Sequence, residues 1–331
     1  MGFRRSAGRR AAPVAVAWSP VTNDPATPVL PRSGIVLIDK PQGITSHDVV
    51  SRTRRMAQTR KVGHAGTLDP MATGLLVLGV NSSTRLLTYL VGLDKVYLAT
   101  IRLGAASSTD DAEGQLGERS DTSSVTPARI AEGIALLTGE IEQVPSTVSA
   151  IKVGGKRAYA LARAGEEVEL ASRRVTISEF TVVSEPRTVD GFIDVDVRVA
   201  CSSGTYIRAL ARDLGVFLGV GGHLTALRRT SVGPFDIADA LVLTGDREAD
   251  AAIDFDSHLL HPAEVAGQLF ATVRVDSDRV RDLENGKRVP LDGVEASDDP
   301  IAVVAPDGRL VGLVRYNGTA ARVLVNFPTG A

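Results

Sequence analysis

The side chains most capable of chemistry stand in one segment, GHAGTLDPMATGLL (63–76). It places His64 and Asp69 among three glycines and follows the acid with Pro70. Glycine lets the backbone approach a ligand closely, and a loop held by a rigid strand is a usual position for catalytic groups. Taken alone, an Asp-Pro pair in a glycine-rich loop is more typical of a turn. The segment is therefore a candidate that needs support from elsewhere in the chain.

Several other kinds of active site are absent from the sequence. There is no GxxxxGK[ST] phosphate loop, no GxGxxG that opens a helix, no HExxH and no GxSxG. The five histidines lack metal-ligand spacing, and a single cysteine excludes both a cysteine-clustered zinc site and an intrachain disulfide. A second acid for glycoside chemistry cannot be paired with Asp69 from sequence. What remains is one acid in a basic, glycine-rich setting.

Charge is distributed unevenly along the chain. The formal net charge is −2, which by itself argues against a nucleic-acid binder. Residues 40–103, however, hold nine Lys or Arg and three acids, a local net of +6. Residues 236–331 hold nine basic and 17 acidic residues, a local net of −8. A polyanion would therefore meet the first region, although solvated faces explain the same charges equally well.

The elements that would position this acid can be predicted from patterning. Strands are expected at 35–39, 75–80, 95–104, 175–184 and 192–201, with short strands after residue 270. Helices are expected at 45–56, 83–91, 127–137 and 205–219. The first helix has the capping-box pair Thr45 and Asp48, and the third has Pro127 at its first position. Residues 59–74 are expected to form a loop, and residues 105–124 a polar surface insertion. The absence of a clean βαβ rhythm favours an α+β fold.

Length and composition predict a globular protein of about two domains. Residues 1–33 are expected to be a disordered arm, because they are rich in arginine and proline and lack a lasting period. A signal peptide is the rival interpretation, but its apolar stretch, Ala11–Trp18, is short and contains a proline. No apolar run approaches the roughly 18 residues of a membrane helix, so a cytoplasmic protein is expected. Cys201 ends a strand-like run and is expected to be a buried, inert thiol.

Segment 63–76 resembles the signature loop of the TruB-type tRNA pseudouridine synthases, in which the aspartate is the nucleophile. Further segments resemble other motifs of that family, in the family's order: KPQGITSHDVV (40–50), DKVY (94–97), VSAIKVGGKRAYALARAGEEVEL (148–170), GTYIRALARDLG (204–215) and GGHLTALRRTSVGPF (221–235). Together they cover about residues 34–240, and several motifs in order make the match specific. The chain departs from the family in its longer N-terminal arm and at Ser108, where family members often carry another aspartate.

The resemblance implies a domain organisation. A pseudouridine synthase catalytic domain with a mixed or antiparallel sheet would span residues 34–250. Residues 251–331 would form a small C-terminal β domain similar to PUA-type RNA-binding modules. No cofactor and no metal are implied, because an isomerisation consumes nothing.

The resemblance also implies roles for individual residues. Asp69 would attack either the base or the sugar of the target uridine, Arg208 would pair with it, and Tyr97 would stack on the flipped uracil and handle a proton. A nucleophile must be ionised, so burial of the acid would require a cation nearby. Five further residues would bind the substrate or shape its site: His64, Tyr206, Leu227, Lys40 and Asp111. Taken singly, each has a plainer interpretation as a core, strand, surface or solvated loop residue.

The implied substrate is the T-loop uridine of tRNA, presented on the T-arm stem-loop to a monomer that needs no protein partner and no membrane. Extruding that uridine costs a few kcal/mol, which phosphate contacts from residues 40–103 would offset. Aromatic residues make up 4% of the chain, so binding should depend on shape and phosphates. Two rivals stay open. One is a non-catalytic tRNA-binding or RNA-folding protein, which would carry a damaged nucleophile loop, and the other is a guide-RNA-dependent synthase of the same superfamily.

Overall fold

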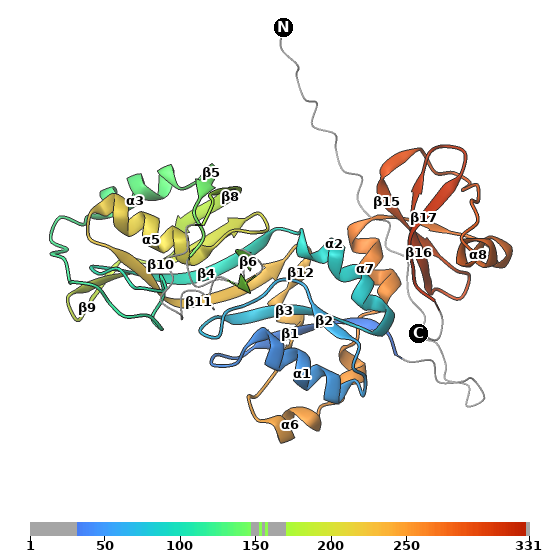
Figure 1. The fold of residues 1–331 in the computed structure, drawn as a ribbon, viewed down its shortest axis with the longest axis horizontal. Helices are drawn as coiled ribbons and strands as arrows, with labels where there is room; N and C mark the ends of the chain where they lie inside the picture. The colour runs from blue at the N-terminus through green and yellow to red at the C-terminus, as the bar shows by residue number, and fades with distance from the viewer. Residues whose placement is uncertain (1–31, 147–151, 154–155, 158–169, 329–331) are drawn as a thin grey trace, which may run out of the picture. The chain divides into compact units, whose positions relative to one another are not determined.

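The computed structural model describes residues 32–146, 152–153, 156–157 and 170–328 (Figure 1). Two expectations therefore fall almost entirely outside the described residues: the disordered arm over residues 1–33 and the RNA-facing segment over residues 148–170. No helix within the described ranges is long and apolar enough to cross a membrane.

The larger sheet has 11 strands and carries the candidate loop. Its main order is β13 (Leu241–Val242), β1 (Gly34–Lys40), β3 (Thr73–Val80), β11 (Gly222–Val232), β4 (Lys95–Leu103), β10 (Phe192–Cys201), β8 (Arg173–Val182) and β5 (Gly139–Gln143). Three short strands pair beside it: β2 (Val62–His64) with β3, β9 (Arg187–Val189) with β10, and β12 (Phe235–Asp236) with β11. The pairs β1–β13 and β3–β11 are parallel and the others antiparallel. This mixed sheet confirms the predicted α+β class.

Helices interrupt the strands. They are α1 (Ser46–Met56), α2 (Leu87–Val91), α3 (Pro127–Leu136), α5 (Ile207–Leu218), α6 (Arg247–Ala251), α7 (Pro262–Leu269) and α8 (Ser277–Glu284), with the 3-10 turns η1 (Asn81–Leu86), η2 (Ile237–Asp239) and η3 (Phe255–His258). Four of the helices, α1, α2, α3 and α5, lie where helices were predicted, and α6, α7 and α8 were not predicted. The capping box of α1 is confirmed, because Thr45 Oγ1 accepts from Asp48 N at 3.0 Å and Asp48 Oδ2 accepts from Thr45 N at 2.9 Å. Pro127 is the first residue of α3, as predicted.

Two predicted elements differ from the structure. The helix expected at 83–91 begins as the 3-10 turn η1, and only its last part is α-helical. Hydroxyl side chains compete for backbone groups there, as Thr84 Oγ1 does by donating to Asn81 O at 2.8 Å. The expected loop 59–74 contains β2, which pairs with the end of β3 from Val62 to His64.

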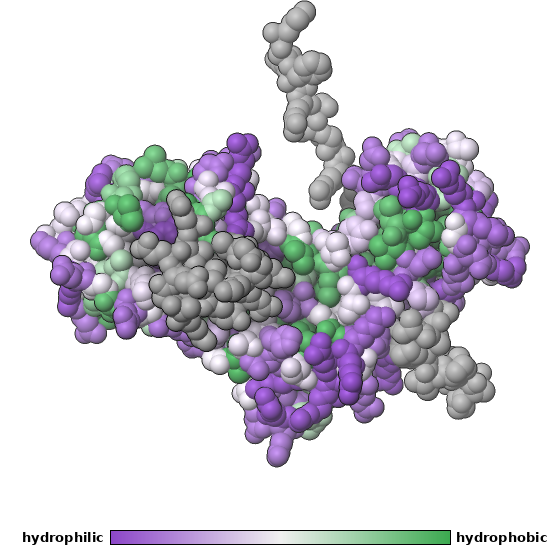
Figure 2. Space-filling view, in the orientation of Figure 1, coloured by the Kyte–Doolittle hydropathy of each residue, from purple (hydrophilic) through white to green (hydrophobic). Residues whose placement is uncertain are grey.

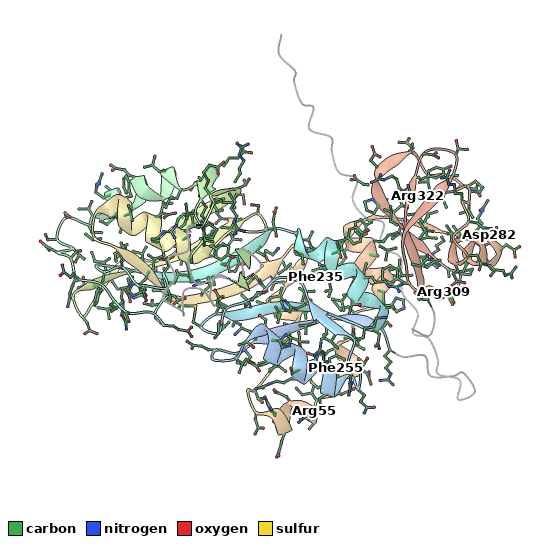
Figure 3. The ribbon with its side chains drawn as sticks, in the orientation of Figure 1. Arg55, Phe235, Phe255, Asp282, Arg309 and Arg322 are labelled. Atoms are coloured by element: carbon green, nitrogen blue, oxygen red, sulfur yellow. The ribbon has the colours of Figure 1, made fainter. Side chains whose placement is uncertain are left out.

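Strands β1 and β3 are buried on both faces, which is why their sequences are continuously apolar. On one face Val36 and Ile38 pack with α1, and Phe255 of η3 joins them (Figure 3). On the other face Ile35 and Leu37 pack with α2 and α7. The strand that leads out of the candidate loop is thus held from both sides.

The other half of the large sheet is covered on one face by α3 and α5 (Figure 1). Ile130 of α3 and Leu210 of α5 pack with apolar residues of β4, β8, β10 and β11 in one cluster. Leu68 of the candidate loop and Tyr97 of β4 belong to the same cluster. The core therefore reaches up to the proposed nucleophile, and Cys201 is buried in it as expected.

A second sheet of four strands lies in the C-terminal part of the chain. Its order is β14 (Ala271–Arg274), β15 (Ser297–Val304), β16 (Leu310–Tyr316) and β17 (Ala321–Asn326). It has a core of its own, to which Val280 and Leu283 of α8 contribute. A separate pair, β6 (Lys152–Val153) and β7 (Lys156–Arg157), forms a two-stranded ribbon. The small C-terminal sheet was predicted; the boundary after residue 250 and the likeness to PUA modules stay predictions.

Candidate active site

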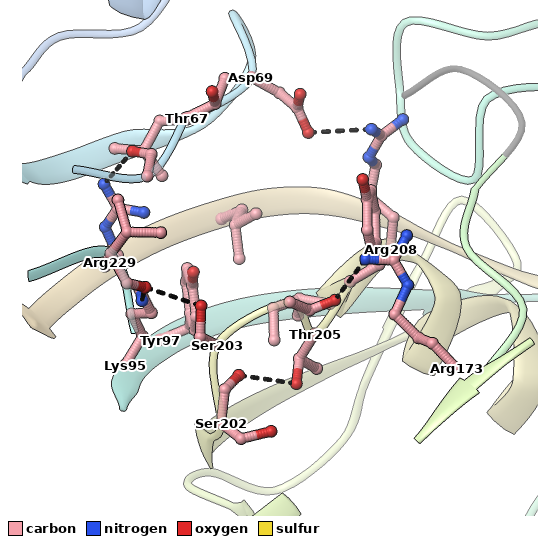
Figure 4. A pocket seen from close by; sticks show the side chains of 17 residues that line it. Thr67, Asp69, Lys95, Tyr97, Arg173, Ser202, Ser203, Thr205, Arg208 and Arg229 are labelled. Atoms are coloured by element: carbon pink, nitrogen blue, oxygen red, sulfur yellow. Dashed lines mark hydrogen bonds and ion pairs between the residues drawn. The ribbon is translucent and has the colours of Figure 1, made fainter. Parts of the chain in front are cut away.

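A cavity of about 260 Å³ opens where the candidate loop meets the middle of the large sheet (Figure 4). Its walls come from residues 66–69, strands β4, β8 and β11, and the segment that leads into α5. Five of the predicted site residues line it: Asp69, Tyr97, Arg208, Tyr206 and Leu227. These residues come from four separate stretches of sequence, so folding alone has brought them together.

Asp69 is presented by a turn whose flanking side chains are anchored in the core. Leu68 and Met71 are buried, and Asp69 between them lines the cavity. Ala72 N donates to Asp69 O at 3.1 Å and closes a turn with Pro70 at its second position, where the fixed φ of proline fits. The Asp69-Pro70 pair therefore forms a turn, and this turn places the Asp69 side chain at the cavity.

The first motif holds the peptide groups on both sides of Asp69. Ser46 Oγ, at the start of α1, accepts from Leu68 N at 2.8 Å and donates to Leu68 O at 2.9 Å. Gly43 N donates to Pro70 O at 2.9 Å. Segments 40–50 and 63–76 are thus one structural unit, with the acid at its surface.

Lys40 completes this unit from within. Its side chain is buried, and Nζ donates to Ile44 O at 2.7 Å, to Pro41 O at 3.0 Å and, more weakly, to Pro70 O at 3.4 Å. Burial lowers the pKa of Lys40 to about 8, although the charge of nearby Asp69 acts against this change. The lysine binds carbonyl groups of the loop unit and is not among the residues that line the cavity.

Arg208 connects the candidate nucleophile to a second acid. Its Nη2 lies 3.0 Å from Asp69 Oδ2 and its Nη1 lies 3.2 Å from Asp111 Oδ2, while Nη1 also donates to Thr109 O at 2.9 Å. The side chains of Arg208 and Asp111 are each 4% exposed, whereas that of Asp69 is 39% exposed. Asp111 and the Thr109 carbonyl therefore hold one terminal nitrogen of the Arg208 guanidinium on its buried side, and the other terminal nitrogen lies against Asp69 at the cavity.

The beginning of α5 places Arg208 and Tyr206. No side chain of its own caps the helix, but buried Gln143 at the end of β5 accepts from Tyr206 N at 2.8 Å and donates to Tyr206 O at 3.1 Å. The guanidinium of Arg173 lies 5.0 Å from the centre of the Tyr206 ring, within cation–π range. Tyr206 and Arg173 therefore form one stacked side of the cavity.

Tyr97 and Leu227 enter the cavity from the adjacent strands β4 and β11. Leu227 is paired with Ala99, and Arg229 is paired with Tyr97 directly across the strands. Burial raises the pKa of Tyr97 above its ordinary value, and the charge and hydrogen bond of Arg229 act against the rise. At neutral pH the tyrosine is a neutral phenol, and its hydroxyl lies next to a cation.

Three predicted residues lie outside the cavity wall. Asp111 is behind Arg208, Lys40 is inside the loop unit, and His64 is on β2 next to the loop. Burial, followed by the charge of Arg229, lowers the pKa of His64, so its imidazole is neutral at pH 7. The roles assigned to these residues stay predictions.

The expectation that residues 105–124 are a surface insertion is wrong at its centre. Asp110 and Asp111 are both buried, because arginines of α5 bind them. Arg208 pairs with Asp111, and Arg212 Nη1 lies 3.1 Å from Asp110 Oδ2. One buried ion pair, Arg208–Asp111, and one partly exposed ion pair, Arg212–Asp110, attach the segment to the helix that carries the cation of the site.

Sequence reasoning missed three cations of the cavity: Lys95, Arg173 and Arg229. Lys95 Nζ donates to Val91 O at 2.7 Å and Leu93 O at 2.6 Å, and burial lowers its pKa to about 8. Lys95 and Arg229 lie in two segments that resemble family motifs, DKVY and LRRT. The sequence therefore marked the segments, but the resemblance implied no role for either residue. No sequence pattern pointed to Arg173, because its place at the cavity depends on its contact with Tyr206 in the folded protein.

Family models match most of the described chain. Residues 54–207 match the TruB family pseudouridylate synthase N-terminal domain, and residues 208–266 match the tRNA pseudouridylate synthase B C-terminal domain. Residues 270–328 match a model described as tRNA pseudouridine synthase II, C terminal. The three matches follow one another along the chain without overlap.

Whole proteins give the same result. A tRNA pseudouridine synthase B of Leifsonia xyli subsp. xyli is 59% identical over 300 residues, which are 89% of this chain and 97% of that protein. The protein of the same name from Thermobifida fusca is 51% identical over 297 residues, 89% of this chain and 98% of that one. A chain in a solved Cbf5–Nop10–Gar1 complex is 25% identical with a TM-score of 0.65, over 89% of this chain and 85% of that chain. The protein therefore belongs to the TruB family of pseudouridylate synthases.

Proposed function

We propose that this protein converts uridine-55 in the T loop of tRNA to pseudouridine, with Asp69 as the nucleophile. The observation that carries the proposal is the pairing of Asp69 with Arg208 at 3.0 Å in a cavity that Tyr97 also lines. The relatives named tRNA pseudouridine synthase B support the substrate and the reaction.

The reaction is an isomerisation, so its atoms balance without a co-reactant. The bond from N1 of uracil to C1′ of ribose breaks, and a bond from C5 to C1′ forms. C5 loses its proton and N1 gains one. The carboxylate of Asp69 can open this sequence at either C1′ or C6, and both routes need the same three functions: an ionised carboxylate, a group that relays the proton, and a pocket that holds the detached base.

The cavity provides these functions on separate elements. Asp69 is displayed by its turn and paired with Arg208. The neutral hydroxyl of Tyr97 can relay a proton, by passing its own proton on towards N1 as it takes up the one released from C5. Its ring packs next to Leu227, which would bound the base from the side. Tyr206 and Arg173 stack at a further wall, where a flat uracil would fit.

A base inside a folded tRNA must leave its stack to reach such a cavity, which costs a few kcal/mol. Basic side chains on the surface would offset part of this cost through phosphate contacts. Arg55 on α1 and Arg247 on α6 are exposed beside one surface hollow, over which Figure 2 shows a strongly hydrophilic face. Arg52 in the same hollow is already bound in an ion pair with Asp250. We expect the T-arm stem-loop to be recognised by a monomer without a protein partner, in the cytoplasm where tRNA is modified.

The test uses purified protein and a bare T-arm stem-loop labelled with tritium at C5 of uridine. The proposal predicts tritium release without any added protein or guide RNA, and none from a stem-loop with cytidine at the target position. A protein that binds the stem-loop but releases no tritium would be an RNA-binding or RNA-folding protein. Activity that requires an added guide RNA would identify a guide-dependent synthase instead.

A further inference from the structure

Arg229 is a cation buried in the floor of the cavity. Arg229 is 1% exposed, and its side chain is among the largest fully buried ones in the described protein. Nε donates to Leu75 O at 2.7 Å and Nη2 donates to Gly66 O at 3.0 Å. In the described part of the chain these hydrogen-bond acceptors are backbone carbonyls and not a carboxylate. Burying a charge in this way is costly unless its donors are occupied.

The donors of Arg229 connect parts of the site that are far apart in sequence. Leu75 belongs to β3, Gly66 belongs to the nucleophile loop, and Tyr97 on β4 is the cross-strand partner of Arg229. Directly paired residues on neighbouring antiparallel strands have their Cβ atoms about 5 Å apart on the same face. Arg229 and Tyr97 therefore project together into the cavity that both line (Figure 4).

The glycine of the nucleophile loop fits closely over this guanidinium. Gly66 has φ +95°, a conformation that side chains other than glycine rarely adopt. A Cβ atom at Gly66 would lie 3.5 Å from Arg229 Nη1 and 3.8 Å from Lys95 Cε. The backbone of the nucleophile loop at Gly66 thus lies directly against the side chains of Arg229 and Lys95.

We propose that Arg229 is a positioning residue for the reaction, which holds the Tyr97 hydroxyl in a fixed relation to the loop that displays Asp69. The inference rests on the proposed function of the site. One rigid guanidinium bridges the loop and β3 and lies next to the tyrosine, so the distance between nucleophile and hydroxyl is fixed before substrate enters. The donors of a guanidinium lie on three separate nitrogens of one rigid plane and can reach groups that stand apart, whereas the donors of an ammonium group all radiate from one nitrogen.

The charge of Arg229 has a second consequence for Tyr97. Burial raises the pKa of the tyrosine, and Arg229 is the strongest opposing influence. The other ionisable groups facing Tyr97 are Asp69 from the loop and Cys201 from β10, both of which raise its pKa. Lys95, which stands two residues before Tyr97 on the same face of β4, also lines the cavity. Removal of Arg229 should therefore make the phenol a weaker proton donor and a less readily ionised group.

The experiment compares two adjacent arginines of β11. Arg229→Gln removes the buried cation, and Arg228→Gln is the matched control, because the side chain of Arg228 is 42% exposed and pairs with Asp39 at 2.6 Å. All five tyrosines are replaced by 3-fluorotyrosine, whose more acidic hydroxyl brings the titration into an accessible range. The Tyr97 signal in fluorine NMR is assigned by its loss in Tyr97→Phe.

Arg229→Gln should raise the pKa of fluorinated Tyr97 by about one unit and lower the single-turnover rate on the stem-loop by about tenfold or more. Arg228→Gln should leave the Tyr97 titration unchanged. Arg229→Lys, which keeps the charge and is the variant to use if the glutamine protein does not fold, should raise the pKa less but still slow the reaction. An unchanged titration in Arg229→Gln, or a wild-type rate in Arg229→Lys, would overturn the proposal.

The two proposals fail separately. The NMR titration needs no RNA, so it reports on the contact between Arg229 and Tyr97 even if the substrate is another RNA. Lack of tritium release from the wild-type protein would refute the proposed function and leave the titration result standing.

Discussion

Asp111 and Arg208 form an ion pair that is buried on both sides. Their side chains are each 4% exposed, and 3.2 Å separates Oδ2 of the acid from Nη1 of the guanidinium. The other terminal nitrogen of Arg208 lies 3.0 Å from Asp69. One guanidinium therefore joins the acid at the cavity to an acid from a segment that the sequence alone presents as a polar insertion.

Asp111→Ala should lower the single-turnover rate by about tenfold or more, because Arg208 loses the partner that holds it towards Asp69. Breaking a buried ion pair costs about 3–5 kcal/mol, and the loss of unfolding free energy should be at the lower end because Arg208 keeps Asp69 and the Thr109 carbonyl as partners. Asp121→Ala is the control, because Asp121 is an exposed acid of the same segment that accepts hydrogen bonds from Ser123 N and Oγ. Equal effects of the two substitutions would contradict the structural role of Asp111.

Tyr97→Phe should reduce turnover far more than tRNA affinity. The ring keeps its packing in the core cluster, but the hydroxyl next to Arg229 is lost. Proton transfer by a positioned side chain contributes about 10²–10⁴-fold, so a loss of at least about a hundredfold is expected, with a dissociation constant within about threefold of wild type. Tyr89→Phe is the control, because Tyr89 packs edge-on against Phe270 outside the cavity. Full single-turnover activity in Tyr97→Phe would leave the tyrosine only a packing role.

Lys40→Met should change the pH dependence of stability. Burial lowers the pKa of Lys40 to about 8 from 10.5, so between these values the unfolded chain binds more protons at this site than the folded protein does. The unfolding free energy of the wild type therefore rises with pH over this window through Lys40, and the variant lacks that contribution. The difference between wild type and variant should increase by on the order of 1 kcal/mol after allowance for solvent screening.

Urea unfolding at about pH 7.5 and about pH 9.5 measures this difference, with Lys61→Met as the control for removal of an exposed lysine. A difference that stays constant or decreases over the window would show that Lys40 is not held as a buried cation. The result would then remove the argument that this lysine organises the loop around Asp69.

Arg173 should contribute to RNA binding, because its cation stands at the cavity wall on the ring of Tyr206. Arg173→Ala should weaken binding of the stem-loop several-fold and reduce the salt dependence of the affinity. Arg174→Ala is the matched control: that side chain is 74% exposed and its ion pair with Glu142 spans 3.6 Å. The same loss of affinity in both variants would mean that the effect is a general one of surface charge.

Much of the fold followed from local signals in the sequence. The capping residues Thr45 and Thr126 set the starts of α1 and α3, and apolar runs gave β1 and β3. The 3-10 turn η1 was missed, because its apolar pattern is helical while its hydroxyl side chains disrupt the first turn. The sequence predicts no strand at β11, because its charged residues hide the apolar pattern of a central strand.

The site was predictable only in part for a related reason. Asp69, Tyr97 and Arg208 stand in segments with a family resemblance, and the fold brings them to one cavity. Which of the two arginines Arg228 and Arg229 faces that cavity depends on the register of β11 against β4, and this register shifts twice within the strand. A shift of one residue exchanges the faces of a strand, so alternation in the sequence could not decide between them.

We propose that Asp69 performs the chemistry and does not contribute to RNA affinity. Asp69→Asn keeps the size of the side chain and most of its hydrogen bonding but removes the carboxylate nucleophile. The decisive measurement is tritium release from a C5-labelled T-arm stem-loop, together with filter-binding titrations of the same RNA at several salt concentrations. We expect no detectable release by Asp69→Asn, with a dissociation constant within about threefold of wild type and the same weakening of binding as salt rises. Release at a substantial fraction of the wild-type rate would contradict the assignment of Asp69 as the nucleophile.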